Sequence, residues 1–169
     1  MAVHIRPAAP GDALAIARVD VESWRWAYPG LLPQGYLDGL SVERRARRWR
    51  ALLGATRSRT STWMASDEGG CCGVAAAGPV RPEIPGVGEL YSLYVSERVF
   101  GRRVGHRLLA FAVAQLRAML YGSAVLWVLE RNERARRFYE REGWSSTGAR
   151  RREQRGGAFV TVVQYRRTL

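Results

Sequence analysis

The order of apolar and polar residues along the chain predicts short strands that alternate with amphipathic helices. Residues 3–6 alternate as in a strand, and Asp12 is placed to cap the helix that follows. One stripe of this helix carries the apolar residues Leu14, Ala17, Val21 and Trp24. Ser41 is placed to cap a second helix, whose apolar stripe is Val42, Ala46, Trp49 and Leu53. We therefore expect a strand and two amphipathic helices to open the fold.

The middle of the chain predicts a hairpin, a third strand and a long helix. Residues 60–65 and 71–77 are β-capable runs, and the segment 67–70 between them, Asp-Glu-Gly-Gly, is a strong turn signal. The run 89–95 alternates as in a strand and leads through a glycine-containing turn into a helix at about residues 103–120. The apolar residues that this helix is expected to bury are Leu109, Ala112, Val113, Leu116 and Leu120.

The last third of the chain predicts a buried strand, a short helix and a closing hairpin. Residues 124–129 are fully apolar, which suits the middle of a sheet. Asn132 begins a helix that ends at Gly143, and residues 145–151 and 159–165 form two strands joined through a glycine pair. We find no long linker, repeat or low-complexity segment, so the chain is predicted to be a single α/β domain over residues 1–169.

Composition fits a globular protein that folds without a metal or disulfide framework. The chain has 169 residues, of which 47% are hydrophobic and 25% charged. Its two cysteines, Cys71 and Cys72, are adjacent, which is a poor arrangement for a disulfide, and no second pair completes a zinc site. The longest apolar stretch, residues 108–120, is too short to span a bilayer, and no signal segment is recognised, so we expect a cytoplasmic protein without a metal.

The net charge of +12 raises the possibility of a polyanionic partner. All 27 basic residues are arginine, which we attribute to coding bias on solvated helix faces rather than to nucleic-acid binding. The same charge would help to hold a phosphorylated cofactor.

The segment that joins the strand 89–95 to the long helix has the features of a phosphate site. Unpaired N–H groups of the first helical turn and of the glycine-containing loop would converge on one point, where the helix dipole also favours negative charge. The residues expected to bind in this way are Phe100, Gly101, Arg102, Arg103, Val104 and Gly105. One glycine between a strand and a helix is usually only a turn residue, so this loop is not specific by itself.

A second segment makes the pattern specific. Residues 132–144, Asn-Glu-Arg-Ala-Arg-Arg-Phe-Tyr-Glu-Arg-Glu-Gly-Trp, fit an Asn-x-x-Ala-x-x-Phe-Tyr-x-x-x-Gly-Phe motif almost residue for residue. Together the two segments resemble the GNAT N-acetyltransferase superfamily. The first segment departs from that family's Gln/Arg-x-x-Gly-x-Gly/Ala motif at Phe100 and Arg103. Arg103 could crowd the pyrophosphate or shift the loop, or its guanidinium could bind a phosphate.

The resemblance implies the fold and the donor site. It implies a mixed, mostly antiparallel sheet of six to seven strands with about four helices, and a splayed central strand pair that admits the pantetheine arm of acetyl-CoA. The backbone of Leu93 and Val95 would bind this arm, and the N–H of Leu93 would polarise the thioester carbonyl. Asn132 and Phe138 are further cofactor-binding positions, although Asn132 can equally serve as a helix cap.

The resemblance also implies candidate catalytic residues. Tyr139 would be the general acid that protonates the departing thiolate, and the alternative is that it only packs beside Phe138. Glu89, which period-2 alternation places on one face with Tyr91 and Leu93, would be the general base. The alternative for Glu89 is a solvated or arginine-paired carboxylate.

The acceptor is not specified by the sequence. Trp26, Tyr28 and Tyr91 are candidate acceptor-binding residues, while His4 and His106 show no partner pattern and are expected on the surface. We expect direct attack of an amine on acetyl-CoA through a tetrahedral intermediate, in a protein that family analogy allows to be a homodimer. Two alternatives stay open: a non-catalytic acyl-CoA-binding or regulatory module, and an acetyltransferase that acts on an RNA-borne or protein amine.

Overall fold

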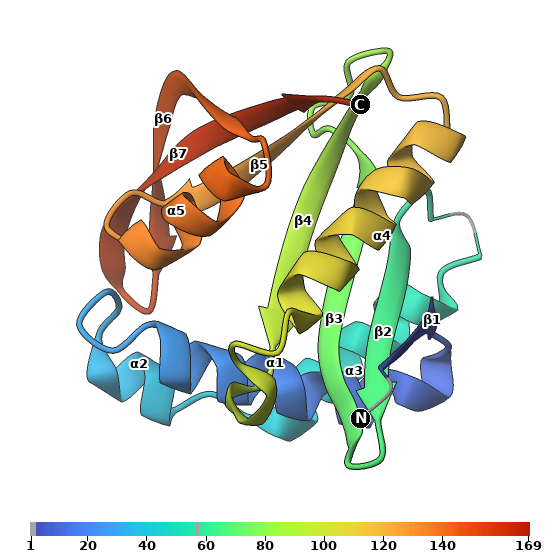
Figure 1. Ribbon diagram of the computed structural model, residues 1–169. Coiled ribbons are helices and arrows are strands. Elements are labelled where there is room, and N and C mark those ends of the chain that lie inside the picture. The colour runs from blue at the N-terminus through green and yellow to red at the C-terminus, as the bar shows by residue number, and fades with distance from the viewer. Residues whose placement is uncertain (1–2, 57) are drawn as a thin grey trace.

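The structure is a computed structural model and describes residues 3–56 and 58–169. The described residues form a mixed seven-stranded sheet in the order β1-β2-β3-β4-β5-β7-β6 (Figure 1). The strands are β1 (His4–Pro7), β2 (Ser61–Asp67), β3 (Gly70–Pro79), β4 (Val87–Val95), β5 (Ser123–Leu129), β6 (Ser145–Arg155) and β7 (Ala158–Thr168). The helices are α1 (Ala13–Ala27), α2 (Gln34–Asp38), α3 (Val42–Gly54), α4 (Val104–Ala118) and α5 (Glu133–Arg141), with 3-10 turns η1 (Pro10–Asp12) and η2 (Glu97–Val99).

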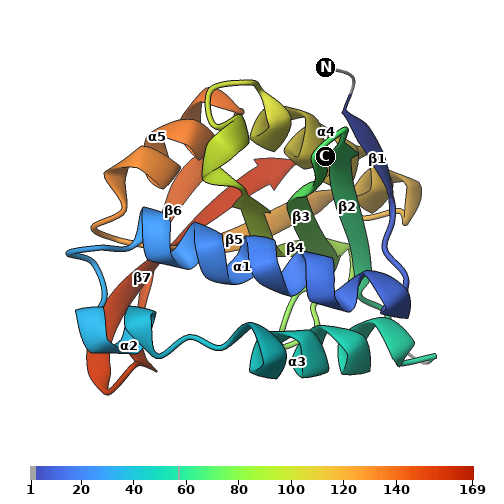
Figure 2. The same ribbon diagram turned by 90° about the horizontal axis from the view of Figure 1, so that it is seen from below.

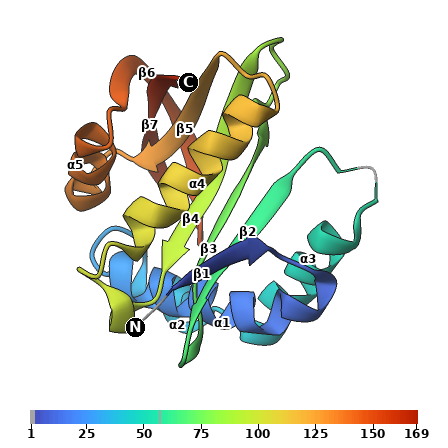
Figure 3. The ribbon, with the colours of Figure 1, turned by 45° about the vertical axis from the view of Figure 1, so that its right-hand side comes forward.

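The helices form two layers on opposite faces of the sheet. Helices α1, α2 and α3 lie beneath it, with α1 and α3 side by side (Figure 2). Helix α4 crosses the other face along β3 and β4, and α5 lies beyond it against β5, β6 and β7 (Figure 3). The α/β class and the mostly antiparallel sheet predicted from the sequence are confirmed.

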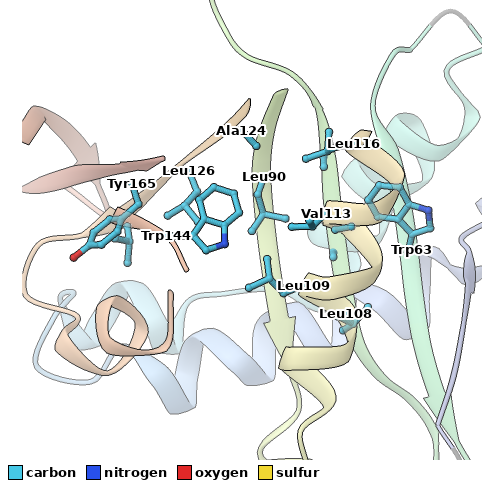
Figure 4. Close-up of a cluster of buried hydrophobic side chains, with 14 of the residues drawn as sticks. Trp63, Leu90, Leu108, Leu109, Val113, Leu116, Ala124, Leu126, Trp144 and Tyr165 are labelled. Carbon is cyan, nitrogen blue, oxygen red and sulfur yellow. The ribbon is translucent and has the colours of Figure 1, made fainter. Parts of the chain in front are cut away.

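The largest hydrophobic cluster lies between α4 and the sheet. Leu109 and Leu116 of α4 pack with Leu90 of β4 and Leu126 of β5, and each is less than 5% exposed (Figure 4). Trp144, at the start of the final hairpin, is 2% exposed and fills the space between this cluster and Tyr165. Full burial of a leucine contributes roughly 1.5–3 kcal/mol, so these contacts hold α4 firmly on β4.

The helices beneath the sheet follow the predicted cap of α3 and most of the predicted buried face of α1. Ser41 caps α3 as predicted, because its Oγ accepts the N–H of Arg44 at 3.2 Å. Three of the four predicted stripe residues of α1 are buried, namely Ala17, Val21 and Trp24. Leu14 is 43% exposed, so its predicted burial is wrong.

Helix α2 was not predicted, because it depends on a distant side chain. It has only five residues, and the guanidinium of Arg25 on α1 donates to three carbonyls at its end, those of Leu37, Asp38 and Leu40. The residues of α2 alone therefore give no sign of the contact that holds this helix.

The central strand pair separates along its length. The parallel strands β4 and β5 are paired only from Val87–Ser123 to Leu90–Leu126. Beyond Leu90, β4 continues to Val95 on β3, and beyond Leu126, β5 continues to Leu129 on β7. The predicted splayed pair is therefore present.

Helix α4 ends in a Schellman motif whose left-handed residue is a leucine. The N–H groups of Leu120 and Tyr121 donate to the carbonyls of Arg117 and Leu116, and Leu120 has φ +66°. Leu120 is 88% exposed, so its predicted burial is wrong. A left-handed conformation costs a non-glycine residue roughly 1–2 kcal/mol.

We expect Leu120→Gly to stabilise the protein by about 0.5–1 kcal/mol, because relief of the left-handed strain exceeds the entropy cost of glycine. Chemical denaturation measures this free energy of unfolding. Met119→Gly is the matched control: Met119 has φ −80°, so the same change there should destabilise. Equal effects of the two substitutions on the free energy of unfolding would contradict the inference that Leu120 is strained by its left-handed conformation.

Candidate active site

A cavity of about 480 Å³ occupies the space where β4 and β5 separate. Its walls come from the second half of β4, the end of β5, the first turn of α4, the inner face of α5 and the end of α1. The predicted site residues that line it are Trp26, Tyr28, Tyr91, Leu93, Val95, Phe100, Gly101, Arg103, Val104, Gly105, Asn132, Phe138 and Tyr139. The structure therefore brings together most of the residues chosen from the sequence.

The backbone of β4 presents polar groups to this cavity. The N–H of Ser96 donates to the carbonyl of Cys72 on β3 at 3.0 Å, and pairing with β3 is regular from Ser92 to Val95. Backbone groups of successive strand residues point to alternate sides, so those of Leu93 and Val95 point away from β3 and toward the gap. There the carbonyl of Val95 is approached by Ser23 Oγ at 3.0 Å.

The loop before α4 has the backbone shape that the glycine motif would give. Gly101 has φ +77°, and Arg103 caps the helix with φ +60°. Arg103 thus adopts the left-handed conformation that glycine adopts without steric cost. The carbonyl of Arg103 accepts the N–H of Arg107, so the N–H groups of residues 104–106 have no partner within the helix. Val104 is 1% exposed and contributes only its backbone here.

The arginines of the loop have different environments. Arg98 forms two hydrogen bonds of 2.8 Å with the carboxylate of Asp67, the last residue of β2, which fixes η2 to the β2–β3 hairpin. Arg102, a predicted cofactor-binding residue, is exposed on the loop and does not line the cavity.

Phe100, Trp26 and Arg134 form a cluster among the residues that line the cavity. The Phe100 ring lies 4.9 Å from the Trp26 ring, and the guanidinium carbon of Arg134 lies 4.0 Å from the Trp26 ring centroid. This aromatic–arginine cluster joins the end of α1, the loop and the start of α5. Phe100 therefore packs the loop in place of the family's usual polar residue.

Helix α5 carries the candidate acid and a capping amide. Asn132 Oδ1 accepts the N–H of Ala135 at 3.1 Å, so the capping role is present and leaves only Nδ2 to donate to a ligand. Tyr139 lines the cavity with Phe138, whose ring centroid is 5.2 Å away. Burial raises the pKa of the Tyr139 phenol above its usual range.

Glu89, Tyr91 and Leu93 of β4 do not share one face of the strand as predicted. Ala76 pairs with Ser92 and Ala77 with Leu90, so Tyr91 is an extra residue that forms a β-bulge. Leu93 consequently lies with Leu90 on the α4 side, whereas Tyr91 packs on the opposite side. The predicted common face of Glu89, Tyr91 and Leu93 is therefore wrong, because period-2 alternation fails at the bulge.

The Glu89 carboxylate is 7% exposed and is not among the described residues that line the cavity. Its Oε2 accepts the N–H of Arg81 at 3.0 Å. Burial raises the pKa of Glu89, and this hydrogen bond opposes the shift because it favours the charged form.

Sequence reasoning missed the role of His106 in the site wall. His106 Nδ1 lies 2.8 Å and 2.9 Å from the two carboxylate oxygens of Glu142, and both residues line the cavity. The pair joins the first turn of α4 to the end of α5. The His106 side chain is 40% exposed, in line with the expected surface position, but the expectation that it has no partner is wrong. The separation of the two residues in sequence gives no signal for the pairing.

The comparisons with known proteins identify the class to which this fold and site belong. The model of the acetyltransferase (GNAT) family matches residues 19–144. The Bacillus subtilis (strain 168) protein "Uncharacterized N-acetyltransferase YuaI" is 35% identical over 132 residues, which cover 77% of this chain and 73% of that protein. "Probable N-acetyltransferase Rv2775" of Mycobacterium tuberculosis is 28% identical over 146 residues, 86% of this chain and 82% of that one.

Solved structures show the same fold. The Thermoplasma acidophilum PaiA N-acetyltransferase in complex with coenzyme A has a TM-score of 0.74 at 19% identity and covers 97% of this chain and 98% of its own. The Sinorhizobium meliloti phosphinothricin acetyltransferase in complex with acetyl-CoA has a TM-score of 0.75 at 20% identity, and the match covers 100% of this chain and 89% of that one.

The chain belongs to the GNAT acetyltransferase family. It is an acetyltransferase of the class that uses acetyl-CoA as donor. Within residues 3–56 and 58–169, we find no helix long and apolar enough to cross a membrane.

We expect Arg103→Gly to raise the free energy of unfolding by about 0.5–1 kcal/mol, because glycine adopts φ +60° without steric cost. Arg103→Ala keeps the Cβ and should give no such gain. Thermal and chemical unfolding of both variants checks this, and equal stability of the two would contradict it. Acetyl-CoA titrations on the same variants then separate crowding by the Cβ, which only glycine relieves, from phosphate binding by the guanidinium, which both variants lose.

Proposed function

We propose that the protein transfers the acetyl group of acetyl-CoA to the primary amine of a small acceptor, by direct attack of the amine on the thioester. The observation that carries this proposal is the unpaired stretch of β4, whose Leu93 and Val95 backbone groups face a cavity that also contains Tyr139. An extended amide-bearing arm can pair with such a strand as a missing neighbour would.

The residues of the cavity fit the chemical parts of the donor. The N–H groups of residues 104–106 and the dipole of α4 suit a pyrophosphate, and Arg103 beside them adds positive charge. The Leu93 and Val95 backbone and Asn132 Nδ2 suit the amides of the pantetheine arm. The closed end of the wedge, where Leu90 pairs with Leu126, limits how far the thioester enters.

The proposed reaction needs three contributions from the chain. The acceptor amine must lose a proton before it attacks, since an ammonium has no lone pair. The N–H of Leu93 then stabilises the oxyanion of the tetrahedral intermediate. As the carbon–sulfur bond breaks, the phenol of Tyr139 gives its proton to the leaving sulfur. The attacking nitrogen loses its extra proton, which restores the phenol, and the neutral amide and the free thiol remain.

Burial suits Tyr139 for this acid role. Its raised pKa keeps the phenol protonated up to at least the usual tyrosine value of about 10. Loss of activity through ionisation of Tyr139 is therefore expected only above that pH.

We expect Tyr139→Phe to lower kcat by roughly 100-fold or more, in the range typical of a lost general acid, with acetyl-CoA affinity little changed. Thiol release gives kcat, and calorimetric titration gives the affinity. Tyr121→Phe, at the end of α4, removes a hydroxyl outside the cavity lining and should behave as wild type. A wild-type kcat for Tyr139→Phe would leave this residue only a packing role.

Glu89 is the proposed general base, and its distance from the lining means that it would act through water. Its Oε1 is free of the hydrogen bond that Arg81 makes with Oε2. The raised pKa makes the carboxylate a better proton acceptor near neutral pH.

We expect Glu89→Gln to lower kcat/KM and to remove the limb of the pH profile that rises as Glu89 ionises. The stability of the variant relative to wild type should increase as the pH rises from 4 to 7, because a carboxyl whose folded pKa is raised costs stability once the unfolded chain ionises. Glu83→Gln, on an exposed carboxylate paired with Arg59, is the control. An unchanged pH profile would refute the base role.

A non-catalytic acyl-CoA-binding module is the second candidate, and the observation that favours it is the arginine at the left-handed position of the phosphate loop. Calorimetric titration with acetyl-CoA, paired with thiol release over a broad amine library, separates the two. Binding with amine-dependent release supports the transferase. Binding without release from any amine supports the module.

A further inference from the structure

Arg155 is a basic residue of the final hairpin that lines the cavity next to Trp24 of α1. It is the last residue of β6, it lines the cavity, and its Cζ lies 5.5 Å from the Trp24 ring centroid. The next residue, Gly156, is pressed against α2: a Cβ there would lie 2.3 Å from Tyr36 Cγ. The hairpin turn is thereby held against α2, and Arg155 is held with it.

The charge of Arg155 is only partly compensated. Its Nε and Nη2 donate to Glu153 Oε2 at 3.0 Å and 2.6 Å. The same carboxylate also binds Arg151 through Oε1, so one negative charge serves two guanidinium groups. No hydrogen bond from Nη1 to another described residue is present, and the Arg155 side chain is 36% exposed. The guanidinium can therefore donate to a further anionic group.

The cavity offers no free carboxylate to a second positive charge. Among the described lining residues the acid is Glu142, and it is engaged by His106. Asp20 lies behind the aromatic wall, outside the lining, and accepts from Trp49 at 2.9 Å and from Arg45 at 3.5 Å. An acceptor with several ammonium groups would lack counter-ions in this cavity, whereas an acceptor with an anionic group could pair with Arg155.

Arg155 lines the same cavity as the candidate acid Tyr139 and as Tyr28. The Trp24 ring links Arg155 to Tyr28, because the Arg155 Cζ lies 5.5 Å from the Trp24 ring centroid and the Tyr28 ring centroid lies 4.9 Å from it. A ligand whose reacting end lies at Tyr139 therefore shares its cavity with this guanidinium.

We propose that the acceptor is a small primary amine that carries an anionic group, as an amino acid does, and that Arg155 binds this group. This inference rests on the acetyl transfer proposed above. The amine would lie at Leu93 and Tyr139, and the carboxylate or phosphonate would reach past Tyr28 to Arg155. The bidentate geometry of a guanidinium suits either anion. Arg155 would thus determine acceptor specificity, and it would take no part in the chemical step of acetyl transfer.

The test compares acceptors that differ only in the anionic group. Thiol release is measured for α-amino acids, for the corresponding α-amino acid amides and for 1-aminoalkylphosphonates. We expect the best acid to exceed its amide in kcat/KM by roughly 10- to 100-fold, mainly through KM, as a charge-assisted contact would give. In Arg155→Gln this ratio should fall toward one, and Arg155→Lys should restore part of it.

Arg151→Gln is the matched control, because Arg151 binds the same carboxylate but is not among the described residues that line the cavity. It should keep the acid-to-amide ratio, and circular dichroism verifies that each variant is folded. If amides or simple amines react as well as acids, or if Arg155→Gln keeps the ratio, this inference is wrong while the transferase stands. If no amine causes thiol release, the proposed function fails and this inference fails with it.

Discussion

The site depends on the interruption of one hydrogen-bonded ladder. Backbone groups that leave a ladder must find other partners, and strands left open in this way tend to close again. Here β4 stays on β3, and β5 stays on β7 through Leu129, so neither strand is free to cross the gap. The bulge at Tyr91 lies directly after the last β4–β5 pair and redirects β4 at the point of separation. The cleft is thus built into the pairing of the sheet.

Side chains from all around the opening hold its shape. Ser23 of α1 approaches the carbonyl of Val95, and His106 is bound to Glu142 across the α4–α5 side. Trp26, Phe100 and Arg134 contact one another and so join the end of α1, the loop before α4 and the start of α5. These contacts connect segments far apart in the sequence, which explains why a wedge lined by apolar walls does not collapse.

The sequence predicted the parts of this arrangement that depend on local pattern. The strands, the caps at Ser41 and Asn132 and the placement of the two motif segments beside one cavity follow from residues within one or two turns of each other. The parts that failed depend on distant contacts or on backbone conformation. Helix α2 needs Arg25 from α1, the bulge at Tyr91 shifts the faces of β4, and the left-handed Leu120 lies where apolar periodicity predicts burial. The His106–Glu142 pair likewise has no signature in the spacing of either residue.

The two halves of the cavity come from different parts of the chain. The proposed donor side is built from β4, α4, β5 and α5, a continuous central segment, whereas Trp26 and Tyr28 come from the end of the first helix and Arg155 from the last hairpin. Gly156 against Tyr36 is where the two outer segments meet. If the acceptor binds as proposed, exchange of these outer segments between relatives would change the acceptor and leave the donor side unaltered, provided that the glycine and its tyrosine are moved together.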